Sequence, residues 1–106
     1  MNKLNAFIYC RVLTEEARNL LMYQEDILSK KAVEDGYEIF GKISLVHTGK
    51  SFGSFKMQAL IRYIRKEKIN AIYIYDKTRL SIYEDLYIEF KMLCDMHHVE
   101  IICLNS

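Results

Sequence analysis

The chain has 106 residues, of which 51% are apolar and 27% charged, with four glycines and no proline. A chain of this length forms one domain and buries a hydrophobic core without help from disulfides or metals. The many apolar residues and the net charge of +1 exclude intrinsic disorder. The same balance of charge neither indicates nor excludes a nucleic-acid partner.

The cell compartment follows from apolar runs and cysteine usage. No apolar run approaches the roughly 20 residues of a membrane span, and the first ten residues lack the features of a secretory signal peptide. The chain has three cysteines, Cys10, Cys94 and Cys103. Their odd number and apolar surroundings are typical of reduced thiols. We therefore expect a cytoplasmic protein with no membrane partner.

The first half of the chain alternates between an apolar run and a helical period. We expect a strand over residues 6–10 and then a helix with Thr14 as its N-cap, which ends at Gly36. A second strand is predicted over residues 37–43. Two glycines among serine and threonine indicate a loop over residues 47–54.

The second half repeats the alternation. Met57, Leu60, Ile61 and Ile64 mark a second helix, and residues 72–75 a third strand. Ser81 and Glu84 have the spacing of a capping box. They open a third helix whose apolar face extends to Cys94, and a fourth strand is expected over residues 99–104.

The order βαβαβαβ predicts a three-layer α/β domain over residues 1–106, with a four-stranded, mainly parallel sheet flanked by helices on both faces. Such sheets place their sites beyond the carboxyl ends of the strands. Here those ends lie within residues 10–14, 44–54 and 76–82.

Two of these segments carry an arginine. Arg11 follows the first strand and Arg79 follows the third, so both are expected at the same edge of the sheet. Two guanidinium groups beside a helix N-terminus form an oxyanion or phosphate site. The same spacing also fits two solvated surface arginines.

Gln24 interrupts the apolar stripe of the first helix, which runs through positions 17, 20, 21, 24, 27 and 28. A buried amide needs hydrogen-bond partners. Either this side chain reaches backbone or water at the edge of the stripe, or it points toward the strand ends and orients an arginine there.

In residues 9–14 (YCRVLT) and 75–81 (YDKTRLS), together with Gln24, the chain resembles the N-terminal catalytic domain of the serine recombinases, the resolvase and invertase family. That family has a first strand ending Tyr-x-Arg-x-Ser-Thr, a glutamine on the following helix, and a later strand running into Asp-Arg-Leu-Ser-Arg. The turn at residues 36–39 and the Thr-Gly of residues 48–49 also fit. The similarity spans nearly the whole chain in order.

The resemblance implies a chemistry. In the family, a serine hydroxyl attacks a DNA phosphodiester and becomes linked to the 5′ phosphate, while arginines stabilise the phosphate without a metal or other cofactor. Arg11 and Arg79 then correspond to phosphate-binding arginines, and Tyr9, Gln24 and Asp76 to supporting residues. The implied partners are DNA and either a second copy of this chain or another recombinase.

The departures from the family pattern are informative. Leu13 occupies the serine slot, Thr78 replaces an acid, Ile82 replaces an arginine, and Ser54-Phe55 replaces an Arg-Pro pair. They imply a recombinase domain that has lost its chemistry, or a non-catalytic module that pairs with itself or with an active recombinase. Thr14, next to the serine slot, is a weaker candidate for a substitute nucleophile, because a capping hydroxyl faces backbone amides.

Three other sequence patterns are weaker evidence of a function. Cys94, His97, His98 and Cys103 offer metal-type ligands, but helix phase places Cys94 in the core, so we expect no metal. The basic run at residues 62–68 is typical of a solvated helix face and less often of a DNA-backbone contact. No glycine-rich turn follows the first strand, which disfavours a nucleotide or flavin pocket.

Family members continue past the point of Ser106 into a dimerisation helix and a DNA-binding domain, so we expect this piece alone to bind DNA weakly.

Overall fold

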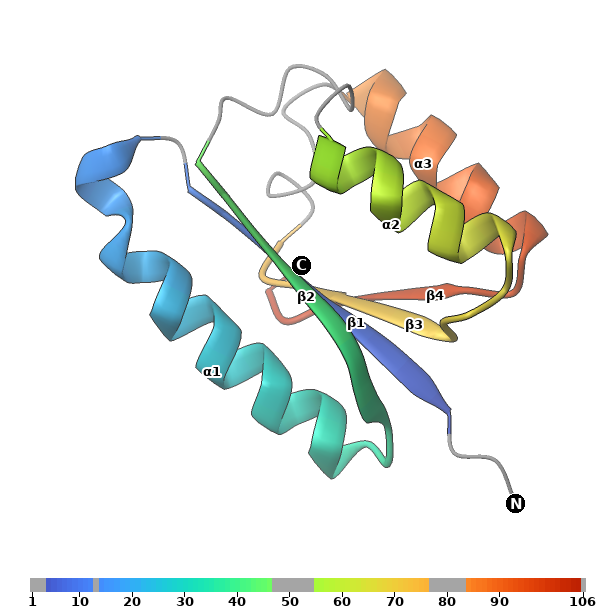
Figure 1. Ribbon diagram of the computed structural model, residues 1–106, viewed down its shortest axis with the longest axis horizontal. Helices are drawn as coiled ribbons and strands as arrows, with labels where there is room; N and C mark the ends of the chain where they lie inside the picture. Colours follow the sequence, from blue (N-terminus) through green and yellow to red (C-terminus); the bar gives the residue numbers. More distant parts are fainter. Residues whose placement is uncertain (1–3, 13, 47–54, 77–83, 106) are drawn as a thin grey trace.

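The computed structural model describes residues 4–12, 14–46, 55–76 and 84–105 (Figure 1). Four strands form one sheet in the order β2-β1-β3-β4, and all three neighbouring pairs are parallel. The strands are β1 (Asn5–Val12), β2 (Glu38–Val46), β3 (Ala71–Ile74) and β4 (Glu100–Cys103). This confirms the predicted α/β fold, its parallel sheet and its βαβαβαβ order.

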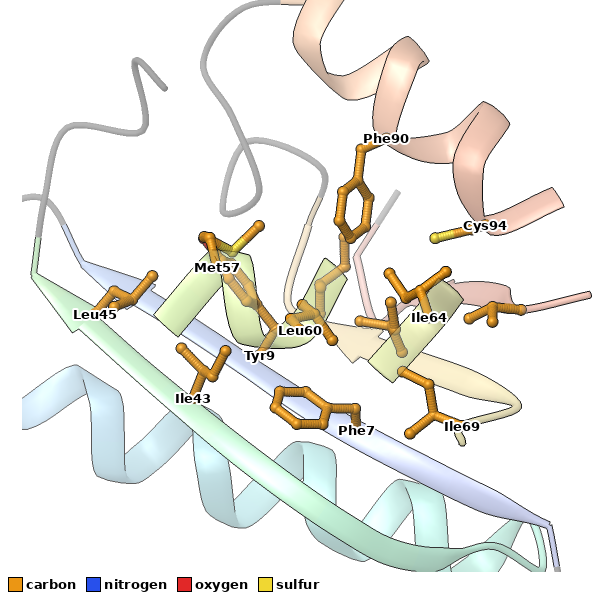
Figure 2. Packing of buried hydrophobic residues seen from close by; sticks show 13 residues of the cluster. Phe7, Tyr9, Ile43, Leu45, Met57, Leu60, Ile64, Ile69, Phe90 and Cys94 are labelled. Atoms are coloured by element: carbon orange, nitrogen blue, oxygen red, sulfur yellow. The ribbon is translucent and has the colours of Figure 1, made fainter. Parts of the chain in front are cut away.

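Helices cover both faces of the sheet, as the three-layer prediction requires. Helix α1 (Asn19–Glu34) lies on one face, and α2 (Phe55–Arg65) and α3 (Glu84–Met96) lie together on the other (Figure 1). Each face has its own apolar cluster. The α1-side cluster includes Ile8, Cys10, Leu28 and Tyr73. The α2/α3-side cluster includes Phe7, Tyr9, Leu60, Ile72 and Phe90 (Figure 2).

Strand β1 lies inside the sheet between β2 and β3, and its side chains alternate between the two clusters. Phe7 and Tyr9 point toward α2 (Figure 2), whereas Ile8 and Cys10 pack against α1. By the same alternation, Arg11 lies on the α2/α3 face.

Two strands are longer than predicted. β1 extends through Arg11 to Val12, and β2 extends to Val46, because the two pair in register as far as the Val12–Val46 pair. The register shifts once, since Ala6 pairs with Ile39 but Phe7 pairs with Gly41. Phe40 is therefore the extra residue of a β-bulge, which hydropathy alone does not predict.

The start of the first helix differs from the prediction. A short 3₁₀ turn at Glu15–Ala17 comes first, closed by a hydrogen bond from the Ala17 N–H to the Thr14 carbonyl, and α1 begins only at Asn19. Thr14 stands at the N-cap position of this 3₁₀ turn, but its side chain makes no capping hydrogen bond, and the N-cap of α1 is Arg18, so the prediction that Thr14 caps the long helix is wrong. The Glu15 carboxylate pairs with both Nε and Nη2 of Arg18, each at 2.8 Å.

The end of α1 agrees with the prediction. Gly36 has a φ of +94°, its N–H donates to the Val33 carbonyl, and the Tyr37 N–H donates to the Ala32 carbonyl. These are the two hydrogen bonds of a Schellman motif, in which glycine takes the left-handed conformation without strain.

Asp35, at this same end, ties α1 to the sheet. The Tyr73 hydroxyl of β3 donates a hydrogen bond to its carboxylate, and the Lys31 ammonium lies 3.2 Å from the other oxygen. The Tyr37 ring packs edge-on against the Tyr73 ring at a centroid distance of 5.9 Å. The hydrogen bond from Tyr73, followed by that from Lys31, holds the pKa of Asp35 below its ordinary value.

We therefore expect stability to depend on the ionisation of Asp35. Because its pKa is lower in the folded chain, its contribution is fully present above the unfolded pKa and is lost as the pH falls through the folded pKa. Urea unfolding between about pH 5 and about pH 2 measures this loss. Asp35→Asn and Tyr73→Phe should each flatten the acid dependence. Variants that keep the wild-type slope would show that this contact adds nothing.

Candidate functional site

The carboxyl ends of β1 and β3 separate at the centre of the sheet. The β1–β3 register stops at the Ile8–Tyr73 pair, although β1 continues to Val12. Beyond β3 the chain stays with the other neighbour, since the Asn105 N–H donates to the Tyr75 carbonyl at 2.7 Å. This is the point where the strand order reverses, and in open α/β sheets ligands bind at such a crevice.

The side chain of Gln24, from α1, bonds to β1 beyond its last pairing with β3. Its Oε1 accepts from the Arg11 N–H, and its Nε2 donates to the Arg11 carbonyl, both at 3.3 Å. The amide thus takes the position that a strand neighbour would have. Both expectations for Gln24 hold in part: its side chain bonds to backbone groups, and those groups belong to the arginine at the strand end.

Arg11 itself is buried, with only 3% of its surface exposed. A solvated surface arginine is therefore excluded at this position. A guanidinium is almost never buried without a specific purpose, because removing its charge from water is costly. Burial instead fixes a permanent positive charge at the carboxyl end of β1, on the α2/α3 face.

Tyr9 lies two residues before Arg11 on the same face and is fully buried (Figure 2). Burial raises the pKa of its phenol well above the ordinary value, although the nearby Arg11 charge lowers it in part. The hydroxyl stays protonated and is a hydrogen-bond donor. Among the described residues it has no hydrogen-bond partner.

The other wall of the crevice comes from β3 and α1. Tyr75 and Asp76 follow β3 and are half-buried. Tyr75, Gln24, Leu20 and Tyr23 line a hollow of about 90 Å³. Leu20 was predicted on the inward stripe of α1 but is exposed, because the buried stripe is narrower and consists of Leu21, Gln24, Leu28 and Ala32.

Two side chains at the end of β1 could in principle act as nucleophiles, Thr14 and Cys10. Thr14 is exposed, in extended conformation, and its hydroxyl is not used as a cap. Cys10 is buried among apolar side chains on the α1 side of the sheet. Burial, reinforced by Glu25, raises the pKa of its thiol to about 12, so Cys10 is a neutral, unreactive thiol at physiological pH.

Several predicted site positions lie outside the described residues. They are Leu13, Ser54, Thr78, Arg79, Ser81, Ile82 and the loop of residues 47–54. The structure therefore brings Arg11 and Gln24 together, with Tyr9 beside them and Asp76 on the neighbouring strand end. The pairing of Arg11 with Arg79 stays a prediction.

Within residues 4–12, 14–46, 55–76 and 84–105, no three histidine, cysteine or acidic side chains gather as metal ligands would. Cys94 is buried in the α2/α3-side cluster, where burial raises its pKa to about 12. No helix in the described part of the chain has the length and apolar character needed to cross a membrane.

The fold and the strand-end residues define a class, that of parallel α/β domains with a buried arginine at the switch point. The model of the family "Resolvase, N terminal domain" matches residues 6–106. The chain therefore belongs to the resolvase N-terminal domain family, which confirms the resemblance noted in its motifs.

Solved structures share this fold at low sequence identity. The C-terminal catalytic domain of ISC1926 TnpA, an IS607-like serine recombinase, superposes with a TM-score of 0.91 at 19% identity, covering 97% of this chain and 72% of that chain. The N-terminal catalytic domain of TP901-1 integrase gives 0.84 at 22% identity, covering 94% and 77%. A resolvase family site-specific recombinase from Streptococcus pneumoniae gives 0.82 at 20%, covering 95% and 72%. Among curated proteins, none matches this chain in sequence.

Proposed function

We propose that this chain is a serine-recombinase catalytic domain that acts in DNA recombination in the cytoplasm, binds a DNA phosphate, and does not cut the strand. The observation that carries the proposal is the segment Arg11-Val12-Leu13-Thr14, in which the phosphate-binding arginine is present and the nucleophile is not. A leucine side chain has no lone pair and cannot attack phosphorus.

The retained residues support binding. Two hydrogen bonds from the Gln24 side chain hold the backbone of Arg11. The Arg11 charge is buried, and a buried charge attracts a phosphate more strongly than a solvated charge does. We place Arg79 opposite it, so that two guanidinium groups hold the oxygens of one phosphate. Tyr9 and Asp76 support the site, the first by its available hydroxyl donor and the second at the end of β3.

We expect no covalent protein–DNA adduct when the chain is incubated with supercoiled DNA and with nicked suicide substrates, because the serine slot is occupied by Leu13. Denaturing gels detect such an adduct directly. An active serine recombinase is the positive control. An adduct that disappears in Thr14→Ala would contradict the proposal and identify Thr14, whose hydroxyl makes no capping bond, as the nucleophile.

A second candidate is a non-catalytic interaction module that pairs with itself or with an active recombinase. It is favoured by one observation on α3, where Ile88, Met92 and Met96 are exposed at intervals of four residues. An apolar stripe of this spacing suits a partner helix. Adding the chain to the positive control distinguishes the candidates, because a module that pairs with an active recombinase changes the cleavage rate of that recombinase without forming an adduct itself.

A further inference from the structure

A second cavity lies between the edge strand β2 and helix α2, and neither Arg11 nor Gln24 lines it. We name it the β2–α2 pocket; it has a volume of about 240 Å³. Three aromatic rings line it, from Phe40, Phe55 and Tyr63, together with two lysines, Lys42 and Lys56. Those lysines are the only charged residues among the described ones that line it.

The rings are unusually accessible. Phe55, the first residue of α2, is 82% exposed, and Phe40 and Tyr63 are exposed as well. The Phe40 and Tyr63 rings lie 5.0 Å apart between centroids, at an interplanar angle of 52°. A soluble domain gains nothing in stability by presenting aromatic rings to water, so their gathering around one hollow points to a ligand with an apolar face.

The bulge in β2 creates the hollow. It sets Phe40 out of register, and it brings Gly41 opposite Phe7. A Cβ atom on Gly41 would lie 2.9 Å from Cε2 of the Phe7 ring. Glycine at this position therefore lets the Phe7 ring lie against the strand and line the pocket.

The charges at the pocket are positive. The Lys56 ammonium donates to the Ser44 carbonyl at 3.2 Å. The Lys42 ammonium is turned to the other face of the sheet, where it lies 3.0 Å from the Glu25 carboxylate of α1, so Lys56 supplies the charge on the α2 side. The Lys56 contact is an exposed hydrogen bond, so an incoming phosphate competes with it at small cost.

An extended peptide is a poor occupant. Adding a strand to β2 needs a regular row of free main-chain groups along its edge. The bulge at Phe40 interrupts that row, and Lys56 already occupies the Ser44 carbonyl. Bulges and edge lysines are the features that keep other strands away from a sheet edge.

We propose that the β2–α2 pocket binds an unpaired nucleotide of single-stranded nucleic acid, with its base stacked on the aromatic rings and its phosphate at Lys56. Aromatic platforms beside cations are how proteins bind single strands without reading sequence. The volume is below the roughly 300–1,000 Å³ of pockets for drug-sized ligands, which suits one base rather than several. The inference goes beyond the proposed function, since it needs neither Arg11 nor a nucleophile.

The absence of tryptophan from the chain allows a direct test. Phe55→Trp places one indole at the pocket, and a base stacked on it quenches its fluorescence. We expect saturable quenching by a short oligothymidylate and none by an abasic strand with the same phosphates. Val33→Trp, on an exposed position of α1 across the sheet from the pocket, is the matched control and should not respond. Equal quenching of both variants, or quenching by the abasic strand, would overturn the proposal.

Affinity provides a second measurement. Removing a stacked ring costs on the order of 5- to 100-fold in binding, so Phe55→Ala should weaken anisotropy-detected binding of the oligothymidylate by that factor, and Met22→Ala on α1 should not. Lys56→Gln should reduce the salt dependence by about one released ion, with Lys30→Gln as its control. An unchanged affinity in Phe55→Ala, or displacement of the strand by an acidic tyrosine-containing peptide at equal concentration, would overturn the proposal. A DNA adduct would instead contradict the proposed function and leave this pocket untouched.

Discussion

Replacing Gln24 with leucine is expected to lower the free energy of unfolding by about 2–4 kcal/mol, because it leaves the buried N–H and carbonyl of Arg11 without partners. Gln24 is 2% exposed, so water does not replace the lost bonds. Leucine has a similar size and leaves little cavity, so the loss reports the hydrogen bonds rather than packing. Urea unfolding followed by circular dichroism measures it.

Hydrogen exchange gives the local counterpart of this measurement. The Arg11 amide should exchange much faster in Gln24→Leu than in the wild type under conditions where the chain stays folded. Glu34→Leu, at an exposed position of α1, is the control and should change stability by no more than about 0.5 kcal/mol. An Arg11 amide that stays protected in Gln24→Leu would show that another group holds this strand end.

The sheet was predictable because each strand is a short apolar run and each helix has a clear apolar period. The boundaries of the strands and helices were less predictable, and particular residues show the physical reasons. Arg11 ended the apolar run of β1 in the sequence, yet pairing with β2 carries the strand past it. The start of α1 was misjudged because a 3₁₀ turn at Glu15–Ala17 precedes it, and helix ends of this kind are not encoded by local propensity.

The candidate site, like the fold, was predictable only in part. Arg11 and Gln24 were identified by a charge at a strand end and a polar residue in an apolar stripe, and the structure brings them into contact. The contact of Tyr73 with Asp35 joins residues 38 positions apart and has no local signal. The rings of the β2–α2 pocket were equally hidden, because the pocket depends on a register shift at Phe40.

If Leu13 occupies the serine slot, as we propose, one substitution there could be thought to restore the enzyme, and we expect that it does not. Leu13→Ser supplies a hydroxyl, but a hydroxyl reacts only in a field that stabilises the phosphate it attacks. The resemblance implies that Ser54 and Ile82 correspond to arginines of the family, and Thr78 to an acid. Losing one preorganised group of this kind costs on the order of 10²–10³ in rate, and such losses do not simply add.

We therefore expect Leu13→Ser alone to cleave DNA below detection, even with Arg11 buried in place at the end of β1. The comparison is with Leu13→Ser/Ser54→Arg/Thr78→Asp/Ile82→Arg, each fused to the DNA-binding domain of an active relative and assayed by adduct formation on a suicide substrate. Urea unfolding of both variants separates lost chemistry from lost folding, since removing a packed leucine can itself cost about 1–3 kcal/mol. Cleavage by the single variant at the rate of an active relative would show that the charge field is already complete, with Arg11 and Arg79 sufficient to stabilise the transition state.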